Sequence, residues 1–148
     1  MSFLSTLNIS GSGMTAQRLR LDVVSDNIAN IETTRTEDGG PYRRKMVVLE
    51  AQEPSFREIL EGVRTGQTKN PAGDGVKATA IVEDQTELKP VYDPTHPDAD
   101  EDGYVMMPNI DLVKETADAM AASHAYQANI TAFNTTKQMA QSALEVGR

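Results

Sequence analysis

Cysteine and tryptophan are absent from this 148-residue chain, and aromatic residues make up only 5% of it. Without cysteine, the chain can form no disulfide and no thiolate metal site. With so few aromatic side chains, we expect one modest domain with a thin hydrophobic core. Basic residues are also scarce: 14 Lys and Arg stand against 22 Asp and Glu, for a formal net charge of −8. This balance argues against a nucleic-acid partner, because nucleic-acid binders normally present a basic face.

Long apolar runs are missing as well. None approaches the ~20 residues that a membrane helix needs, so we expect no membrane insertion. The first ten residues, MSFLSTLNIS, contain neither a basic n-region nor a long hydrophobic stretch. We therefore expect no cleaved secretory signal, and export from the cytoplasm would need another route.

The last quarter of the chain, 109–146, lacks both proline and glycine. Asp111 can cap a helix there, because its carboxylate can accept from the free N–H groups of the first turn, and Gly147 stands where a helix tends to stop. Apolar residues recur every seven positions, which suits packing along a partner helix. They are Leu112, Ala119, Tyr126, Phe133 and Ala140, with Ile130 and Leu144 on the adjoining ridge and Val113 and Met120 on the other side. Such a helix spans ~55 Å, more than a small domain can cover, which predicts neighbours.

A second helix is predicted at the N-terminus, from about Ser2 to Ile31. Its seven-residue stripe is incomplete, because Ser10 and Gln17 stand where apolar residues are expected. Gly11 and Gly13 each weaken a helix by roughly 1 kcal/mol relative to alanine, so we expect a firm helix only from about Gly13. The apolar positions are Leu7, Met14, Leu21 and Ile28, with Val24 and Ile31 on the same face. Either stripe alone fits an ordinary core helix. Two such helices with little chain between them favour packing against neighbours.

The middle of the chain is interrupted by prolines and glycines, with short β-like runs between them. Branched and apolar residues within Lys45–Leu49 and Val76–Val82 suit a pleated, half-buried surface. The predicted strands are Tyr42–Glu50, Val76–Glu83, Leu88–Tyr92 and Tyr104–Met107, while Phe56–Val63 fits a short helix or a loop and Gly66–Gly75 a flexible loop tip. The sequence predicts an α+β fold in three segments: an N-terminal core helix (1–33), a small antiparallel β insert (34–108) and a C-terminal core helix (109–148).

An acidic stretch, Asp98-Ala-Asp100-Glu-Asp102-Gly103, matches the first half of a calcium loop. The second half fails, because Asn109 rather than glutamate stands at position twelve and Pro108 precedes it. We interpret the stretch as an acidic turn, since Asp and Gly are turn residues for backbone reasons. No cofactor or metal is expected.

Only two histidines are present. His96 could form an acid–base pair with Asp93, and together with Asp98 this would suit a metal-assisted hydrolase. However, the chain has no nucleophile elbow, phosphate-binding loop, dinucleotide fingerprint or zinc-protease motif, so we expect no enzyme. His124 lies on the last predicted helix beside Tyr126, and we interpret it as a packing or interface residue.

Two sets of polar residues are unusual where they stand in the sequence. Arg43-Arg44-Lys45 is a basic patch in an acidic protein, and we expect it to pair with carboxylates of this chain or of a neighbour. Asparagines in the predicted helices cost helix propensity. These are Asn27, Asn30, Asn129 and Asn134, and both side-chain hydrogen bonding and solvent exposure are open alternatives for them.

Several stretches resemble bacterial flagellar rod proteins. Those that resemble the N-terminal signature of the family are SGSGMTAQRLRLDVV (10–24), SDNIANIETTRT (25–36) and GGPYRRKMV (39–47). Those that look like its proximal-rod members are VYDPTHPDADEDGYVMMPN (91–109), SHAYQANI (123–130) and KQMAQSAL near the end. The motif positions are Asn27, Ala29, Asn30, Thr33, Pro41, Tyr42, Asp93, Pro94, His96, Pro97, Gly103, Tyr104, Tyr126, Ala128 and Asn129. Only about 51–86 is uninformative.

The resemblance implies terminal helices that pack as an antiparallel α-helical coiled coil in the inner core of a tube. It implies a structural subunit of the periplasmic basal-body rod that transmits motor torque and is exported by the flagellar type III apparatus. The implied partners are other rod proteins, copies of the same chain, the MS ring and rod-base components. A regulatory coiled-coil adaptor, or another axial component such as a hook or distal-rod protein, is the alternative. We also expect the terminal helices to be partly disordered in the monomer and to fold on assembly.

Three positions depart from the family pattern. Glu32 stands where many relatives carry a small polar residue, His124 replaces a usual arginine, and Glu115-Thr116 replaces a glutamate–methionine pair. A histidine lacks the permanent charge and forked donors of arginine, so contacts with neighbours are expected to differ there.

Overall fold

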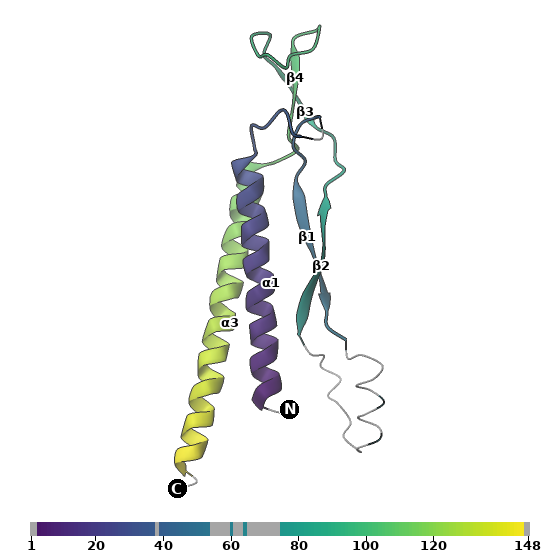
Figure 1. Cartoon of the computed structure of the whole chain (residues 1–148). Helices are drawn as coiled ribbons and strands as arrows, with labels where there is room; N and C mark the ends of the chain where they lie inside the picture. Colours follow the sequence, from purple (N-terminus) through teal and green to yellow (C-terminus); the bar gives the residue numbers. More distant parts are fainter. Residues whose placement is uncertain (1–2, 38, 54–59, 61–63, 65–74, 147–148) are drawn as a thin grey trace. The chain divides into compact units, whose positions relative to one another are not determined.

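The computed structural model describes residues 3–37, 39–53, 60, 64 and 75–146. The elements follow in the order α1 (Phe3–Ala29), β1 (Lys45–Ala51), β2 (Val76–Glu83), β3 (Lys89–Tyr92), β4 (Tyr104–Met107) and α3 (Leu112–Val146) (Figure 1). This order confirms the α+β class and the two long terminal helices. The predictions for 56–63 and 66–74 fall, except at Leu60, outside the described residues.

The chain divides into two compact units. The first unit comprises Met1–Arg18, Leu49–Thr79 and Ser123–Arg148, and the second comprises Leu19–Val48 and Ala80–Ala122. Each unit therefore contains a length of both helices and of strands β1 and β2. The second unit also contains β3 and β4. The division into 1–33, 34–108 and 109–148 stays a prediction.

Helix α3 begins with the cap that the sequence predicts. The Asp111 carboxylate accepts from the N–H groups of Val113 at 3.0 Å and Lys114 at 3.4 Å. These bonds satisfy two donors that the first helical turn leaves free. Glu115 adds a negative charge in the same turn, which complements the helix dipole. The helix has 35 residues, so its length is about 52 Å.

Helix α1 runs through both of its central glycines and ends at Ala29, two residues before the predicted end. In the first unit, a Cβ on Gly13 would lie 2.9 Å from Asn129 Oδ1 of α3. A glycine at this position therefore lets the two helices approach closely. A Cβ on Gly11 would meet nothing within 4 Å, so Gly11 has no such packing role.

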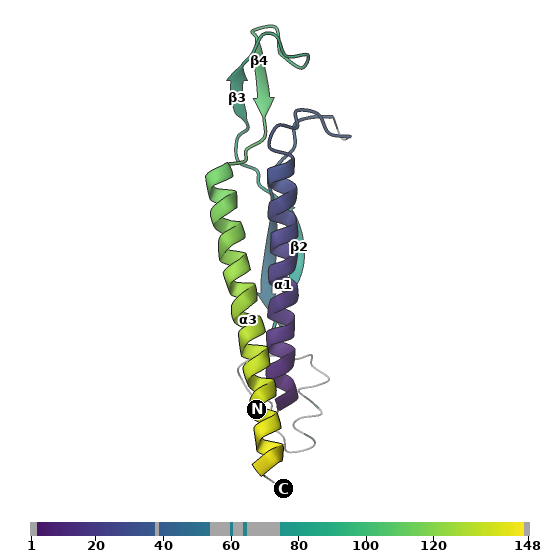
Figure 2. The same cartoon turned by 90° about the vertical axis from the view of Figure 1, so that its left-hand side faces the viewer.

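The two helices are antiparallel. In the second unit, Arg20 contacts Asp118 and Asn27 contacts Glu115, so later residues of α1 meet earlier residues of α3. Both views show α1 and α3 side by side (Figures 1 and 2). This arrangement confirms the predicted packing of the terminal helices.

The inner face of α1 is narrower and more polar than the predicted apolar stripe. The residues buried on it are Ser10, Ala16, Val23, Val24 and Asn27. The seven-residue series, by contrast, is only half-buried; it consists of Leu7, Met14, Leu21 and Ile28. Ser10, which the sequence pattern treats as an interruption, thus belongs to the inner face. The Gln17 side-chain oxygen is also buried, without a hydrogen-bond partner among the described residues.

The described β structure forms two two-stranded sheets. In one, the Asp84 N–H donates to Arg44 O at 2.8 Å and the Gln52 N–H donates to Gly75 O at 2.7 Å. The start of β1 thus pairs with the end of β2, and the strands are antiparallel. In the other, β3 and β4 are antiparallel, with Lys89 opposite Met107 and Tyr92 opposite Tyr104.

Strand β1 begins three residues later than predicted, at Lys45. Two residues before it, Tyr42 and Arg44, donate their N–H groups outside the strand ladder. The Tyr42 N–H donates to Thr33 O at 3.0 Å, and the Arg44 N–H donates to Asn109 Oδ1 at 2.9 Å. These bonds position Arg44 beside the helices.

The hydrophobic core is thin, as the composition predicts. Its buried apolar residues, within the described ranges, are Ala16, Val23, Val24, Tyr42, Val105, Ile110 and Ala122. No helix in the described part of the chain is both long and apolar enough to cross a bilayer. In the second unit, the buried polar residues Asn27 and Glu115 add a hydrogen bond to this core.

Candidate functional site

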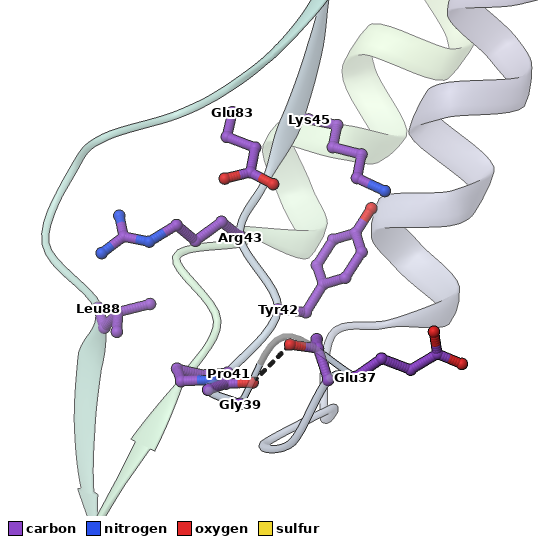
Figure 3. A pocket seen from close by; sticks show the side chains of 10 residues that line it. Glu37, Gly39, Pro41, Tyr42, Arg43, Lys45, Glu83 and Leu88 are labelled. Atoms are coloured by element: carbon purple, nitrogen blue, oxygen red, sulfur yellow. Dashed lines mark hydrogen bonds between the residues drawn. The ribbon is translucent and has the colours of Figure 1, made fainter.

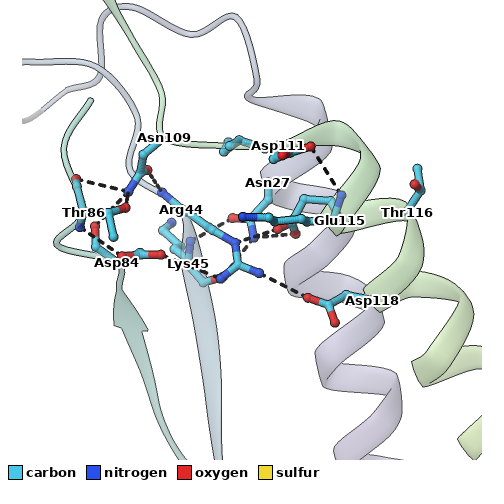
Figure 4. Close-up of polar contacts among 12 residues, drawn as sticks. Asn27, Arg44, Lys45, Asp84, Thr86, Asn109, Asp111, Glu115, Thr116 and Asp118 are labelled. Atoms are coloured by element: carbon cyan, nitrogen blue, oxygen red, sulfur yellow. Dashed lines mark hydrogen bonds and ion pairs between the residues drawn. The ribbon is translucent and has the colours of Figure 1, made fainter. Parts of the chain in front are cut away.

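Glu115 is the largest fully buried side chain among the described residues. Arg44 Nε lies 2.6 Å from Glu115 Oε1, and Asn27 Nδ2 donates to Glu115 Oε2 at 3.1 Å (Figure 4). A buried carboxylate is costly unless it has such partners. Glu115 therefore links α3 both to α1 and to the residue that precedes β1.

Asn27 uses the full hydrogen-bonding capacity of its amide. Its Nδ2 donates to Lys45 O at 2.9 Å and to Glu115 at 3.1 Å, while its Oδ1 accepts from Lys45 N–H at 2.9 Å and from the Tyr42 hydroxyl at 3.2 Å. The side chain thus pairs with the backbone of Lys45 much as a neighbouring strand would. This explains an asparagine inside a helix, where it costs propensity.

Arg44 faces three carboxylates. Besides Glu115, its guanidinium lies 3.2 Å from Asp118 Oδ2 and 3.8 Å from Asp84 Oδ2. Asp118 is shared, because Arg20 Nη2 lies 3.0 Å from its other oxygen. A planar guanidinium with several fixed donors suits this geometry better than a lysine would. Within the chain itself, the predicted pairing of the basic patch with carboxylates is confirmed for Arg44. Arg43 donates instead to the carbonyl oxygens of Asp84 and Thr86, and Lys45 Nζ lies 5.1 Å from the centre of the Tyr42 ring.

We call Asn27, Tyr42, Arg44, Glu115 and Asp118 the polar clasp. All five belong to the second unit and come from α1, α3 and the segment before β1. The sequence pattern identified Asn27, Tyr42 and Arg44 as notable but missed the roles of Glu115 and Asp118. Their spacing of three residues, one helical turn apart at the start of α3, is the signal that could have found them.

Asn109 extends the network to the loop after β2. Its amide donates to Asp84 O at 3.1 Å and to Thr86 Oγ1 at 2.8 Å. The Thr86 N–H in turn donates to the Asp84 carboxylate at 3.0 Å. That backbone bond, assisted by the Thr86 hydroxyl and the positive charges of Arg44 and Arg43, lowers the pKa of Asp84. Asp84 thus stays ionised opposite Arg44.

Tyr42, which belongs to the polar clasp, also lines an open pocket of about 540 Å³ (Figure 3). Burial, followed by the negative charges of Asp26, Glu83 and Glu115, raises the pKa of Tyr42. The phenol therefore remains a hydrogen-bond donor to Asn27 at neutral pH. The charged side chains that line the pocket are Glu37, Arg43, Lys45 and Glu83, so the two signs balance.

The acidic turn between β3 and β4 is built from local hydrogen bonds. The Thr95 hydroxyl and N–H both donate to Asp93 Oδ1, and these bonds lower the pKa of Asp93. His96 Nδ1 accepts from the Asp98 N–H at 3.1 Å, and Thr34 donates to the Asp98 carboxylate at 2.8 Å. No metal-binding group of three or more His, Asp or Glu side chains occurs in the described ranges.

Gly103 closes that turn with a φ of +79°, a backbone conformation that favours glycine. A Cβ there would also lie 3.0 Å from the Tyr92 ring. The prediction of a turn residue chosen for its backbone is confirmed at this position.

The predicted packing residues differ in how far one copy of the chain covers them. Val24 is buried, and most others are half-buried: Leu7, Met14, Leu21, Ile28, Ile31, Ala119, Tyr126, Ile130 and Phe133. Three are exposed: Leu112, Met120 and Leu144. Whether these residues contact other subunits stays a prediction.

The remaining motif and helix residues also differ in hydrogen bonding and in solvent exposure. Asn30 donates to Asp26 O and accepts from Thr33, and Asn129 donates to Ala125 O, so both use hydrogen bonds within or at the end of their helix. Those that are exposed are Ala29, Pro94, Pro97, Tyr104, His124, Ala128 and Asn134, while Pro41, Asp93, His96 and Gly103 are half-buried.

Comparison with known proteins matches the same parts of the chain. A family described as flagella basal body rod protein matches residues 7–35, and one described as flagellar basal body rod FlgEFG protein C-terminal matches residues 101–146. The first range contains Asn27, and the second contains Glu115 and Asp118. Both helical sides of the polar clasp thus lie in family-defining segments.

Whole-chain relatives give the same assignment. The flagellar basal-body rod protein FlgC of Bacillus subtilis is 47% identical over the full length of both chains. That of Borreliella burgdorferi is 42% identical over 99% of this chain and 98% of its own, and that of Salmonella typhimurium is 40% identical over both full lengths. The chain therefore belongs to the FlgC family of flagellar basal-body rod proteins, which are structural subunits of the rod.

Proposed function

We propose that this subunit assembles into the rod through the faces of α1 and α3 that a single copy leaves uncovered. The observation that carries the proposal is a pair on α3: Val113 is 76% exposed and Met120 is 60% exposed. Their seven-residue spacing places both on the same side of the helix. Large apolar side chains grouped on an outer face mark interaction sites.

Other uncovered apolar side chains also support assembly through the faces of α1 and α3. On α1 the half-buried series from Leu7 to Ile28 flanks the inner face, and on α3 Met139 and Leu144 are exposed near the end. Both helices therefore have apolar surface on more than one side. A contact between such unlike faces that does not close into a ring generates a helical assembly. In this proposal 1–33 and 109–148 form the assembling core, with 34–108 as an insert.

The same proposal covers the partners of the subunit, its export and the transmission of torque. The partners would be copies of this chain, other rod proteins, the MS ring and rod-base components, and the type III export apparatus would deliver the subunit. The polar clasp suits transmission of torque, because charge-assisted bonds tie α1, α3 and the start of β1 together. The similarity to structural rod proteins supports a non-enzymatic role.

A matched pair of substitutions on α3 tests the assembly face. Met120→Glu places a charge on the uncovered apolar side, whereas Ala132→Glu places the same charge on an exposed position about a third of a turn around the helix. Each variant is expressed in a flagellated host whose own copy is deleted. We expect Met120→Glu to be missing from isolated basal bodies and to abolish swimming, with an unchanged urea midpoint of the purified monomer. Ala132→Glu should assemble normally. Normal swimming of the Met120→Glu strain would contradict the proposal.

A further inference from the structure

The hairpin of β3 and β4 gathers its large exposed aromatic and sulfur-containing side chains on one face. Side chains alternate between the faces of a strand, so Pro90 and Tyr92 lie on the same side as their cross-strand partners Met106 and Tyr104. On this side Tyr92 is 64% exposed, and Tyr104 and Met106 are each 44% exposed. On the opposite side, Val105 is buried within the second unit, whereas its partner Val91 is 43% exposed. We call Pro90, Tyr92, Tyr104 and Met106 the hairpin face.

The hairpin face is well suited to binding because it is already ordered. The rings of Tyr92 and Tyr104 meet edge to face, with their centroids 5.3 Å apart. Gly103 closes the turn with a positive φ, and a Cβ there would lie 3.0 Å from the Tyr92 ring, close enough that the ring would have to shift. Such a rigid aromatic pair loses little conformational freedom when a partner covers it.

A partner could in principle bind by adding a strand to the outer edge of β3. That edge is poorly suited to such pairing. The Asp93 N–H donates to Gly103 O at 3.0 Å, which makes 93 and 103 a hydrogen-bonded pair. Pairs alternate in an antiparallel ladder, so the backbone of residue 90 points away from β4. Proline has no N–H to offer there, which protects an edge against pairing. A partner would therefore cover the face instead of extending the sheet.

The charge next to the hairpin face indicates what kind of partner fits. The turn carries the exposed carboxylates Asp100, Glu101 and Asp102, and none of them forms an ion pair with a described residue. An apolar face with this rim repels anionic lipid and nucleic acid and attracts a basic surface. We propose that the hairpin face binds a neighbouring protein subunit whose contact surface is apolar at its centre and carries Lys or Arg at its rim. The inference rests on the proposed function, since the rod supplies such neighbours.

Photo-crosslinking in assembled basal bodies tests this inference. The photoreactive p-benzoylphenylalanine replaces Tyr104 in one strain, Met120 in a second and Gln85, an exposed polar residue outside the hairpin face, in a third. The crosslinked peptides are identified by mass spectrometry. We expect the probe at position 104 to capture a peptide of another subunit that contains Lys or Arg, and the probe at position 85 to give at least fivefold less product.

The three positions separate the possible outcomes. If position 120 crosslinks to a neighbour and position 104 does not, the hairpin face is not a docking surface, while the proposed assembly through α3 stands. If neither position crosslinks in isolated basal bodies, the proposed function fails as well. A product at position 104 with a lipid, or with a peptide that lacks basic residues, would also overturn the inference.

A charge reversal tests the rim separately. The double substitution Asp100→Lys and Asp102→Lys should lower the yield of the position-104 crosslink about tenfold, because it replaces attraction by repulsion at the edge of the contact. The same change of charge at Glu50 and Glu53, which are also exposed, serves as the control and should leave the yield unchanged. An equal yield in both double variants would contradict a basic partner.

Discussion

Arg44 and Glu115 form an ion pair with 2.6 Å between Nε and Oε1, in which the glutamate side chain is fully buried and the arginine side chain is 20% exposed. The pair is asymmetric, because Arg44 also faces Asp118 and Asp84, whereas Glu115 has Arg44 as its only ion-pair partner among the described residues. Removing the two partners should therefore have unequal effects on stability.

We expect Arg44→Leu to lower the free energy of unfolding by about 3 kcal/mol, because it leaves the Glu115 carboxylate buried without its cation. Glu115→Leu should cost less, since Arg44 keeps two carboxylates and some contact with water. The double variant should be more stable than the sum of the single effects predicts. Urea unfolding followed by circular dichroism measures all three, and strictly additive losses would show that the pair is not coupled.

The polar clasp also shows which features of the structure could be predicted from the sequence alone. The seven-residue spacing on α3, the cap at Asp111 and the four strands could be predicted, because each depends on residues close together in the chain. The inner face of α1 could not, since Ser10 and Asn27 are buried by partners distant in sequence. Glu115 looked like an ordinary charged residue of a first helical turn. Its burial depends on Asn27, which is 88 residues away in the sequence.

Asn27→Asp should make stability respond to pH in the opposite way from the natural chain. The new carboxylate replaces a donor to Glu115, so two negative charges share a buried site and the pKa of the pair is raised in the folded state. A group with a raised folded-state pKa gains stability as the pH falls. We expect the variant to be strongly destabilised at pH 7 and to recover part of the loss at pH 5.

The natural chain should not gain stability over that range. The pKa of Asp84 and of Asp93 is lowered from the ordinary value of 3.8. Their stabilising contribution is present above that value and is lost only as the pH falls through the lower folded-state pKa. Urea midpoints of both proteins at pH 7 and pH 5 make the comparison. A parallel response of the two proteins would mean that position 27 is not buried beside Glu115.

Gly11 and Gly13 offer a matched test of helix packing. Alanine is favoured over glycine inside a helix by about 1 kcal/mol. Gly11→Ala should therefore stabilise the protein by up to about 1 kcal/mol, because a Cβ there meets nothing within 4 Å. Gly13→Ala should lose most or all of that gain, because its Cβ would lie 2.9 Å from Asn129 Oδ1.

A third variant identifies the cause of that difference. Combining Gly13→Ala with Asn129→Ala removes the obstructing amide and should restore the gain relative to Asn129→Ala alone. Thermal unfolding by circular dichroism is sufficient to rank the variants. Equal stabilisation by the two single alanine substitutions would show that α1 and α3 do not approach closely at Gly13.

Hydrogen exchange on the dilute monomer should show that the helices are unequally stable along their length. The clasp holds 19–29 of α1 and 112–122 of α3 through buried hydrogen bonds and ion pairs. The parts of the helices in the first unit lack buried ion pairs among the described residues. We expect low protection there, since a thin core does not offset the entropy of ordering, and higher protection near the clasp. Assembly would then supply the missing contacts, as in other cases of folding coupled to binding.

The Arg44→Leu variant provides the control for this experiment. If the clasp is the source of protection, the variant should lose it at 19–29 and 112–122 and change little elsewhere. Strong protection along the whole of both helices in the natural monomer would exclude folding on assembly. Protection that survives Arg44→Leu would assign the order near the clasp to Val23, Val24 and Ala122, the apolar residues buried there.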